Sequence, residues 1–202
     1  YYIYNAKSND LTYKNAKEKK FQDATVIFNP STNLDINSLK NEITEHFREH
    51  YQTSAIIFIY CSLATNFKEE IENNLDIIFK GIPKVEEVTL SNNIFYIDYN
   101  INEINVGNSN VFLNKCITDI INQGLINIFV NNGGLVESSG ISHHYVFPSN
   151  KHSAKFLRTA NVLVKKSEID FIAINTLHKF QSIAIKNIYC DTLSINVIGY
   201  SI

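Results

Sequence analysis

The fold of this chain is decided by the run Ser54-Ala55-Ile56-Ile57-Phe58-Ile59-Tyr60-Cys61, which is almost wholly apolar and is bounded by polar residues. The run is far too short to span a bilayer, and it has no polar residue at alternate positions. It therefore predicts a strand that is buried on both faces. Such strands occupy the centre of a parallel sheet with helices on each side, so we expect an α/β protein.

Elements that suit such a sheet lie on both sides of this run. Before it, residues 24–28 are short and β-branched and predict a strand, and Asp35 is expected to cap a helix that runs to about His50. After it, Thr65 is expected to cap a second helix, whose apolar stripe continues to residue 79. Residues 85–90 and 94–99 predict two strands joined as a hairpin. Residues 1–22 are polar and mixed, and no element is assigned to them. We therefore expect a small α/β module over residues 1–105.

The second half of the chain follows an Asn-rich boundary near residues 100–110. Apolar residues at helical spacing predict a helix from residue 112 to about 130, which the run Asn131-Asn132-Gly133-Gly134 terminates. Strands are expected at 135–138, 145–147, 156–164 and 183–190, and a helix at 168–180. The chain contains no Met and ends inside what reads as a new helix. We therefore expect residues 106–202 to be the first part of a second domain that is truncated here.

The composition excludes several classes of protein. A net charge of -2 gives no electrostatic reason to expect nucleic acid as a bulk partner. No apolar run is long enough for a membrane span, and the N-terminus lacks the pattern of a signal peptide. Cys61, Cys116 and Cys190 are widely separated, and each lies in an apolar run. Because this indicates buried thiols in a reducing compartment, we expect a cytoplasmic protein with no membrane partner.

The segment His143–Arg158 resembles neither a core strand nor an amphipathic helix. It holds three His, two Lys and one Arg among aromatic side chains, and two apolar triplets flank a polar turn at residues 149–153. Hydroxyls, an amide and cations at one turn favour an anionic ligand, either a phosphate or a carboxylate. As an alternative, Arg158 faces solvent or pairs with Glu168 or Asp170. The predicted ligand contacts in this segment are Ser149, Lys151, His152, Ser153, Lys155 and Arg158.

A second polar loop follows the apolar run at residues 183–190. Ligands of open α/β sheets lie outside the carboxyl ends of the strands, where the amides of a following helix point at an anion. Asp191, Thr192 and Ser194 are therefore candidates to bind ribose hydroxyls, a metal or a phosphate. The alternative is that Asp191 and Thr192 only cap the helix that follows the strand.

These features resemble a known family. One family pattern consists of an aromatic residue, then a Ser-Gly-x-x-Ser loop, then a second aromatic residue. This pattern is similar to the run Phe147-Pro148-Ser149-Asn150-Lys151-His152-Ser153-Ala154-Lys155-Phe156. With the order of elements around it, this run resembles the N-terminal half of orotate-phosphoribosyltransferase-like type I phosphoribosyltransferases. Residues 111–202 also resemble divergent phosphoribosyltransferase-like domains of bacterial defence and conflict systems.

The resemblance implies the first half of a phosphoribosyltransferase-like fold, with a parallel sheet flanked by helices. It also implies binding of phosphoribosyl diphosphate or a nucleotide, transfer of the phosphoribosyl group to a base, and Mg²⁺ as cofactor. Asp191 and Thr192 would then contact pyrophosphate or its metal. The chain departs from the family where Asn150 replaces Gly and where residues 190–196 lack Gly. The family's strand ending in two acidic residues, followed by a Thr- and Gly-rich loop, would lie beyond Ile202, so we expect the visible chain not to form a complete phosphoribosyl diphosphate site by itself.

The departures at Asn150 and at residues 190–196 favour an alternative function. On this view the domain is catalytically degenerate and serves as a nucleotide sensor or a protein-interaction domain of a bacterial defence system. The sequence is compatible with a homodimer and with binding of a partner protein. Nucleic-acid binding through residues 143–158 is a third possibility; it needs more positive charge and predicts a steep salt dependence.

Other kinds of chemistry have weaker signals. His143, His144 and His152 with Asp191 form an alternative set of metal ligands. Adjacent histidines in a strand point to opposite faces, however, so we predict no metal site built by these histidines. The sequence contains no G-x-S-x-G elbow, no P-loop and no G-x-G-x-x-G motif.

Overall fold

Residues 56–61 form the central strand of a five-stranded sheet, as the sequence predicts. The computed structural model describes residues 1–7, 23–82, 93–100, 104–106, 111–138 and 144–177, and the single positions 187, 189 and 198. The sheet has the order β1-β2-β3-β4-β5, and its strands are β1 (Tyr2–Lys7), β2 (Asp23–Asn29), β3 (Ile56–Cys61), β4 (Ile94–Tyr99) and β5 (Ile104–Val106).

The centre of the sheet is parallel and its two edges are antiparallel. β3 pairs in parallel with β2 and with β4, so that Ile57 lies opposite Val26 on one side and Phe95 on the other. β1 and β5 run antiparallel to their neighbours. β1 is an element that the sequence prediction missed. Its signal is the alternation of buried Tyr2, Tyr4 and Ala6 with more exposed residues, which is the period of a strand.

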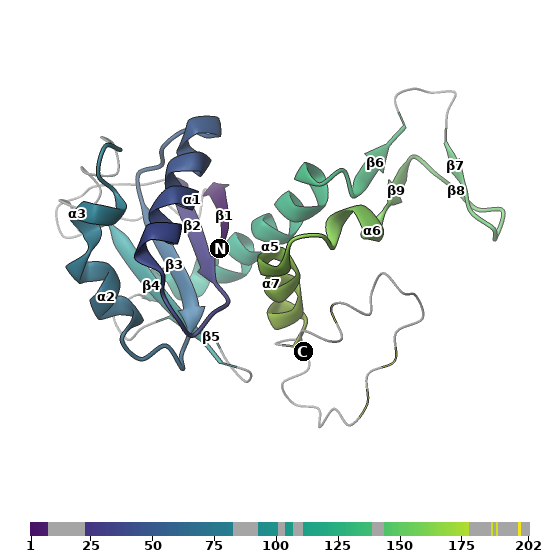
Figure 1. Ribbon diagram of the computed structural model, residues 1–202. Helices are drawn as coiled ribbons and strands as arrows, with labels where there is room; N and C mark the ends of the chain where they lie inside the picture. The colour runs from purple at the N-terminus through teal and green to yellow at the C-terminus, as the bar shows by residue number, and fades with distance from the viewer. Residues whose placement is uncertain are drawn as a thin grey trace.

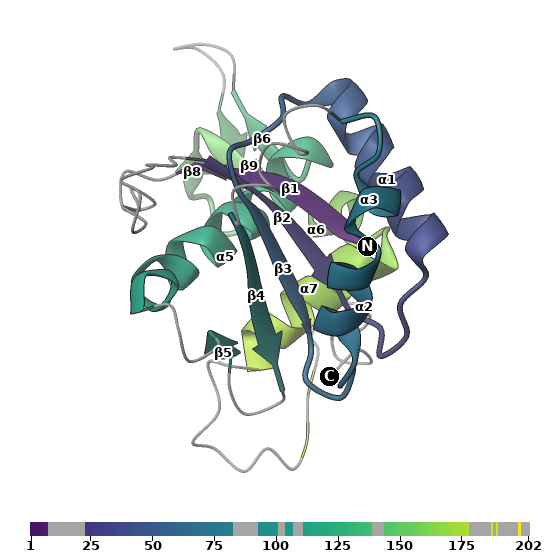
Figure 2. The same ribbon diagram turned by 90° about the vertical axis from the view of Figure 1, so that its left-hand side faces the viewer.

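Three helices cover one face of the sheet: α1 (Ile36–Glu49), α2 (Phe67–Asn73) and α3 (Leu75–Ile78) (Figures 1 and 2). The predicted cap at Asp35 is confirmed, because its Oδ1 accepts hydrogen bonds from the N–H groups of Asn37 at 3.0 Å and Ser38 at 3.1 Å. The predicted cap at Thr65 is wrong, since α2 begins after Asn66. The expected single helix is divided at Asn74, whose side-chain amide donates to the carbonyl of Glu70.

Two later helices cover the opposite face: α5 (Val111–Asn131) and α7 (Lys166–Leu177). The prediction of a helix to about residue 130 is confirmed. The hydroxyls of Tyr2 and Tyr4 on β1 donate to carbonyls of α5, at Gly124 and Ile120. Phe171 of α7 packs edge-on against both tyrosine rings. The residues before and after position 105 therefore share one hydrophobic core.

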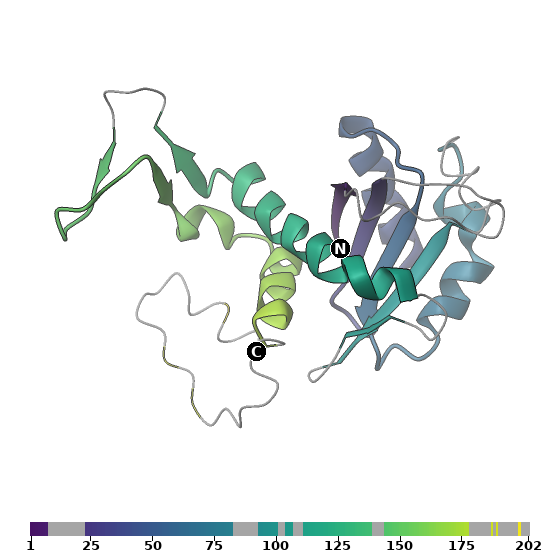
Figure 3. The ribbon, with the colours of Figure 1, turned by 180° about the vertical axis from the view of Figure 1, so that it is seen from behind.

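Residues 135–138 and 144–158 project from this core as an arm (Figures 1 and 3). The arm contains two short antiparallel ladders. In one, β6 (Leu135–Glu137) pairs with β9 (Lys155–Leu157); in the other, β7 (Tyr145–Val146) pairs with β8 (His152–Ser153). Among the described residues, the second half of the chain thus contains antiparallel ladders in place of the predicted parallel sheet.

The predicted strand at residues 156–164 is also wrong beyond its first residues. The chain leaves β9 at Leu157 and turns into the short helix α6 (Thr159–Val162). This turn brings Val162 into the core, where it is fully buried. Burial of one apolar side chain at the base of the arm thus overrides the extended pattern of the sequence.

Some predictions lie outside the described residues. These are the strand at 85–90, most of the strand at 183–190, and the loop with Asp191, Thr192 and Ser194. Within 183–190, only positions 187 and 189 are described, and neither of them is in a strand. Within the described part of the chain, the helices are too short or too polar to cross a membrane.

Candidate functional site

The predicted polar turn closes the ladder of β7 and β8 at the tip of the arm. Its ends are joined by a hydrogen bond of 2.9 Å from the N–H of Phe147 to the carbonyl of Lys151. A second bond, from the N–H of Asn150 to the carbonyl of Phe147, tightens the turn. Asn150 adopts a φ of 58°, in the left-handed region that Gly and Asn tolerate best. Asn150 stands where the family that this segment resembles usually has Gly. Asn can adopt the left-handed backbone conformation that this position requires.

Six of the nine predicted site residues lie along the arm, from its tip to its base. Ser149, Lys151 and His152 are exposed at the tip, and Ser153 is half-buried beside them. The hydroxyl of Ser153 accepts a hydrogen bond of 3.1 Å from the N–H of Lys155, so it helps to shape the chain between β8 and β9. The remaining members, Lys155 and Arg158, are exposed further along the same segment.

The cations of the arm differ in how they are engaged. The ammonium of Lys155 lies 2.6 Å from the carboxylate of Glu137 on the paired strand, and both side chains are exposed. Lys151 and Arg158 form no ion pair within the described residues. Glu168 and Asp170 pair with Lys165 and Lys166, so the alternative partners considered for Arg158 are already engaged.

The base of the arm is fixed by backbone contacts. α5 ends as predicted at the Asn-Gly run, where Gly133 has a φ of 63° and the N–H of Gly134 bonds to the carbonyl of Phe129. The N–H of Arg158 donates to the carbonyl of Gly134 at 2.6 Å. A Cβ at Gly134 would collide with Val162, so α6 can pack here only against Gly. These contacts fix the direction in which the arm leaves the core.

Aromatic side chains support the tip from the side. The rings of Tyr145 and Phe147 lie 5.7 and 6.0 Å from the ring of Phe156, measured between centroids. The rings of His144 and His152 lie 4.4 Å apart. Phe156 therefore ties the turn to β9 by apolar contact, whereas the charged side chains stay exposed.

Metal ligands are not gathered in the described part of the chain, where no group of three or more His, Cys, Asp or Glu side chains could hold an ion. Asp191, to which the resemblance assigns the pyrophosphate or its metal, lies outside the described residues. An anion bound to the described part of the arm would therefore be neutralised by the Lys and Arg side chains of the arm itself.

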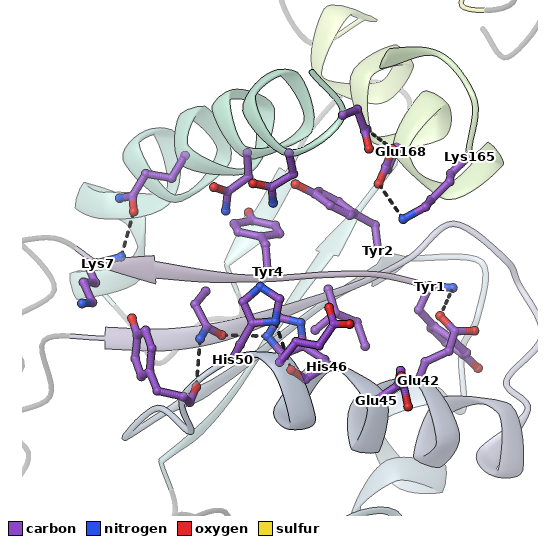
Figure 4. Close-up of a pocket in the computed structure, with 18 residues that line it drawn as sticks. Tyr1, Tyr2, Tyr4, Lys7, Glu42, Glu45, His46, His50, Lys165 and Glu168 are labelled. Carbon is purple, nitrogen blue, oxygen red and sulfur yellow. Dashed lines mark hydrogen bonds and ion pairs between the residues drawn. The ribbon is translucent and has the colours of Figure 1, made fainter. Parts of the chain in front are cut away.

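A second concave surface was missed by sequence reasoning, because β1 was not recognised as a strand. We name it the β1 groove: a pocket of about 730 Å³ along the outer edge of β1, between α1 and α5 (Figure 4). Its lining residues are Tyr1, Tyr2, Ile3, Tyr4, Asn5, Lys7, Glu42, Glu45, His46, Glu49, His50, Tyr51, Gln123, Asn127, Asn131, Asn132, Lys165 and Glu168.

Two stacked histidines and Asn5 are held together in this groove. The Nε2 atom of His46 lies 3.0 Å from Oδ1 of Asn5, and the side-chain amide of Asn5 donates to the carbonyl of Tyr51. Burial, and then the neighbouring His50, lower the pKa of His46 to about 4. His46 is therefore neutral at physiological pH, and its Nε2–H donates to Asn5.

Comparisons of this chain with protein-family models, with curated proteins and with solved structures find no match.

Proposed function

We propose that the arm of residues 135–138 and 144–158 binds phosphoribosyl diphosphate or a nucleotide through its exposed cations and hydroxyls. The observation that supports this most directly is the turn at residues 147–151, which presents Ser149, Lys151 and His152 to solvent from one tight loop. Cations that are not already paired are available to an anionic ligand at the smallest cost.

The spacing of the cations suits a ligand with two separated anionic groups. Lys151, Lys155 and Arg158 follow one another at intervals of four and three residues along a mostly extended segment. Their Cα atoms are therefore roughly 10–13 Å apart from one to the next. Phosphoribosyl diphosphate carries a diphosphate at one end of its ribose and a phosphate at the other, so two neighbouring cations can each take one group.

Transfer of the phosphoribosyl group is the proposed reaction. A nitrogen of the base bonds to the anomeric carbon of the ribose as the bond from this carbon to the diphosphate oxygen breaks. Pyrophosphate leaves with the bonding electrons, and the proton of the attacking nitrogen passes to solvent. The contribution expected of this chain is to position the ligand with Lys151, Lys155 and Arg158. The cation that takes the diphosphate stabilises the negative charge of the leaving group, and its neighbour holds the phosphate. Mg²⁺ is the cofactor that belongs to this proposal.

The test is calorimetric titration of the full chain with phosphoribosyl diphosphate, with and without Mg²⁺. We expect saturable binding that the double variant Lys151→Ala/Lys155→Ala abolishes with little change in the melting temperature. The matched control is Lys68→Ala/Lys80→Ala, which removes two lysines from the helical side of the core and should leave binding intact. Equal binding by both double variants, or no binding by the native chain, would contradict the proposal.

A single carboxylate offers a test in the opposite direction. Glu137→Gln removes the partner of Lys155 and makes its ammonium available to the ligand. We expect a few-fold tighter binding, because an exposed ion pair contributes about 0.2–1 kcal/mol, and a nearly unchanged stability. Weaker binding would place Glu137 itself in contact with the ligand.

A second candidate function is protein interaction through the same arm. Its support is the exposure of apolar side chains on and beside the arm: Val146 is 60%, Leu157 55% and Val164 72% exposed. Sedimentation velocity across a range of concentrations tests this candidate. Self-association that Val146→Ser/Leu157→Ser abolishes would support it for a homodimer, and a monomer at all concentrations would argue against a homodimer.

A further inference from the structure

The outer edge of β1 is open in the described part of the chain. β1 stands first in the order of the sheet, and no described strand pairs with its far side. Its register against β2 continues without a bulge from Tyr2 to Lys7, and it contains no Pro. Bulges, prolines and covering segments are the usual means by which proteins block an exposed edge. Among the described residues, nothing therefore blocks the pairing of β1 with another strand.

The peptide groups that face outward can be assigned from the hydrogen bonds. The N–H of Thr25 on β2 donates to Ala55 beside β3, so the alternate residues of β2 turn their peptide groups towards β1. Opposite these residues lie Tyr2, Tyr4 and Ala6. The peptide groups of Ile3 and Asn5 consequently face the β1 groove.

Side chains close the two ends of this open edge. The N–H of Lys7 donates to Oε1 of Gln123 at 2.8 Å, and the carbonyl of Tyr1 accepts from the hydroxyl of Ser167 at 2.9 Å. Both bonds agree with an outward orientation of every second peptide group. Among the described residues, no hydrogen bond involves the peptide groups of Ile3 and Asn5 on this side.

The two walls of the groove differ in charge. The wall from α1 presents Glu42, Glu45 and Glu49, whose spacing of three and four residues places them on one face of the helix (Figure 4). Glu45 pairs with exposed Arg48, which is a weak interaction, and Glu42 lies 3.0 Å from the amino group of Tyr1. Glu49 forms no ion pair within the described residues.

The opposite wall, from α5, is polar and uncharged. It presents amides at every fourth residue: Gln123, Asn127 and Asn131. Amides both donate and accept hydrogen bonds, so this row suits small polar side chains. A strand lying between the walls would turn alternate side chains towards the carboxylates and the others towards the amides.

We propose that the β1 groove binds an extended basic peptide of a partner protein as an added strand, with Lys or Arg at every second position facing α1. Main-chain hydrogen bonds to Ile3 and Asn5 supply affinity, and the charge of α1 supplies specificity, as in other cases of strand addition. A second copy of this chain fits less well, because its own α1 and α5 would meet the walls of the groove. This proposal is independent of the anion site on the arm.

The experiment uses the full chain and a labelled peptide, acetyl-Thr-Lys-Thr-Lys-Thr-Lys-Thr-amide, followed by fluorescence anisotropy. We expect saturable binding by this peptide. A peptide with Glu in place of Lys, and one with Pro at the central position, should bind at least about tenfold more weakly. The first change opposes the carboxylates of α1, and the second removes an N–H that strand pairing needs.

Variants of the protein separate the groove from general electrostatic attraction. Glu45→Lys/Glu49→Lys should weaken binding of the Lys peptide by at least about tenfold. Its control, Glu69→Lys/Glu70→Lys, makes the same change of charge on exposed residues of α2 and should keep binding within about twofold. Circular dichroism of both variants establishes that each is folded.

Four outcomes would overturn the proposal. The first is the absence of saturable binding, and the second is an equal loss in the two double variants. The third is undiminished binding of the Pro peptide, because it would show that main-chain pairing is not involved. The fourth is a dimer of the protein that the peptide dissociates, because the groove would then belong to a second copy.

Discussion

Gly124→Ala tests how closely α5 packs on β1. The carbonyl of Gly124 accepts a hydrogen bond of 2.6 Å from the hydroxyl of Tyr2. A Cβ at this position would lie 2.6 Å from Cζ of Tyr4 and 2.9 Å from Cε1 of Phe171. Tyr4 is 3% and Phe171 1% exposed, so neither ring can turn into solvent to make room. The added methyl group must therefore push α5 away from the sheet or force the rings out of their packing.

The opposing effects can be compared in magnitude. Ala is more favourable than Gly in a helix by about 1 kcal/mol. Overpacking of a core costs about 1–3 kcal/mol, and the hydrogen bond of 3.0 Å from Tyr4 to the carbonyl of Ile120 contributes about 1 kcal/mol more if it is broken. The packing terms are larger, and we expect a net loss of about 2 kcal/mol. For a chain of this length, this corresponds to a fall of about 4–8 °C in the melting temperature.

Urea unfolding followed by far-ultraviolet circular dichroism measures this difference. Asn122→Ala is the control, because Asn122 is an exposed residue of the same helix and its replacement changes only helix propensity. The control should be slightly more stable than the native chain. If Gly124→Ala were as stable as the control, α5 would not lie against Tyr4 as described.

Substitutions at three further positions test local features. His46 has a pKa of about 4 in the folded chain against 6.5 when free, so the unfolded state binds more protons between these values. Stability should fall by about 1–2 kcal/mol as the pH drops through this window, after allowance for solvent screening, and His46→Gln should lose this dependence in urea titrations. Asp35→Ala should cost about 1 kcal/mol in urea unfolding, whereas Asp35→Asn should retain most of the cap. Asn150→Gly should preserve the turn of the arm, and Asn150→Val should destabilise it by about 1–2 kcal/mol, measured as faster hydrogen exchange of the amide of Phe147.

The sequence was informative where local pattern and burial agree. The apolar run at residues 54–61 predicted the central strand, because a strand buried on both faces needs apolar side chains at every position. The cap at Asp35 and the helix stop at residues 131–134 were likewise predictable, since capping and a left-handed glycine depend on the nearest backbone atoms.

The prediction failed where a distant contact decides the conformation. β1 has tyrosines at its buried positions, and these become favourable in the core only because carbonyls of α5 accept their hydroxyl bonds. The strand predicted over residues 156–164 ends early, because Val162 is buried against Gly134. Neither partner is close in sequence to the residue that it affects.

The sequence alone predicted the site on the arm but not the β1 groove. It identified the turn of the arm, because a cluster of Ser, Asn, Lys and His is visible without any knowledge of the fold. It also defined the apolar run around which the sheet forms. The tertiary structure alone decided that the arm projects from the core (Figure 1). It alone also decided that Glu42, Glu45 and Glu49 line the same groove as Gln123, Asn127 and Asn131, along an edge of β1 that no described strand pairs with. The physical reason is that these walls come from helices that are far apart in the chain and are brought together by packing on opposite faces of one sheet.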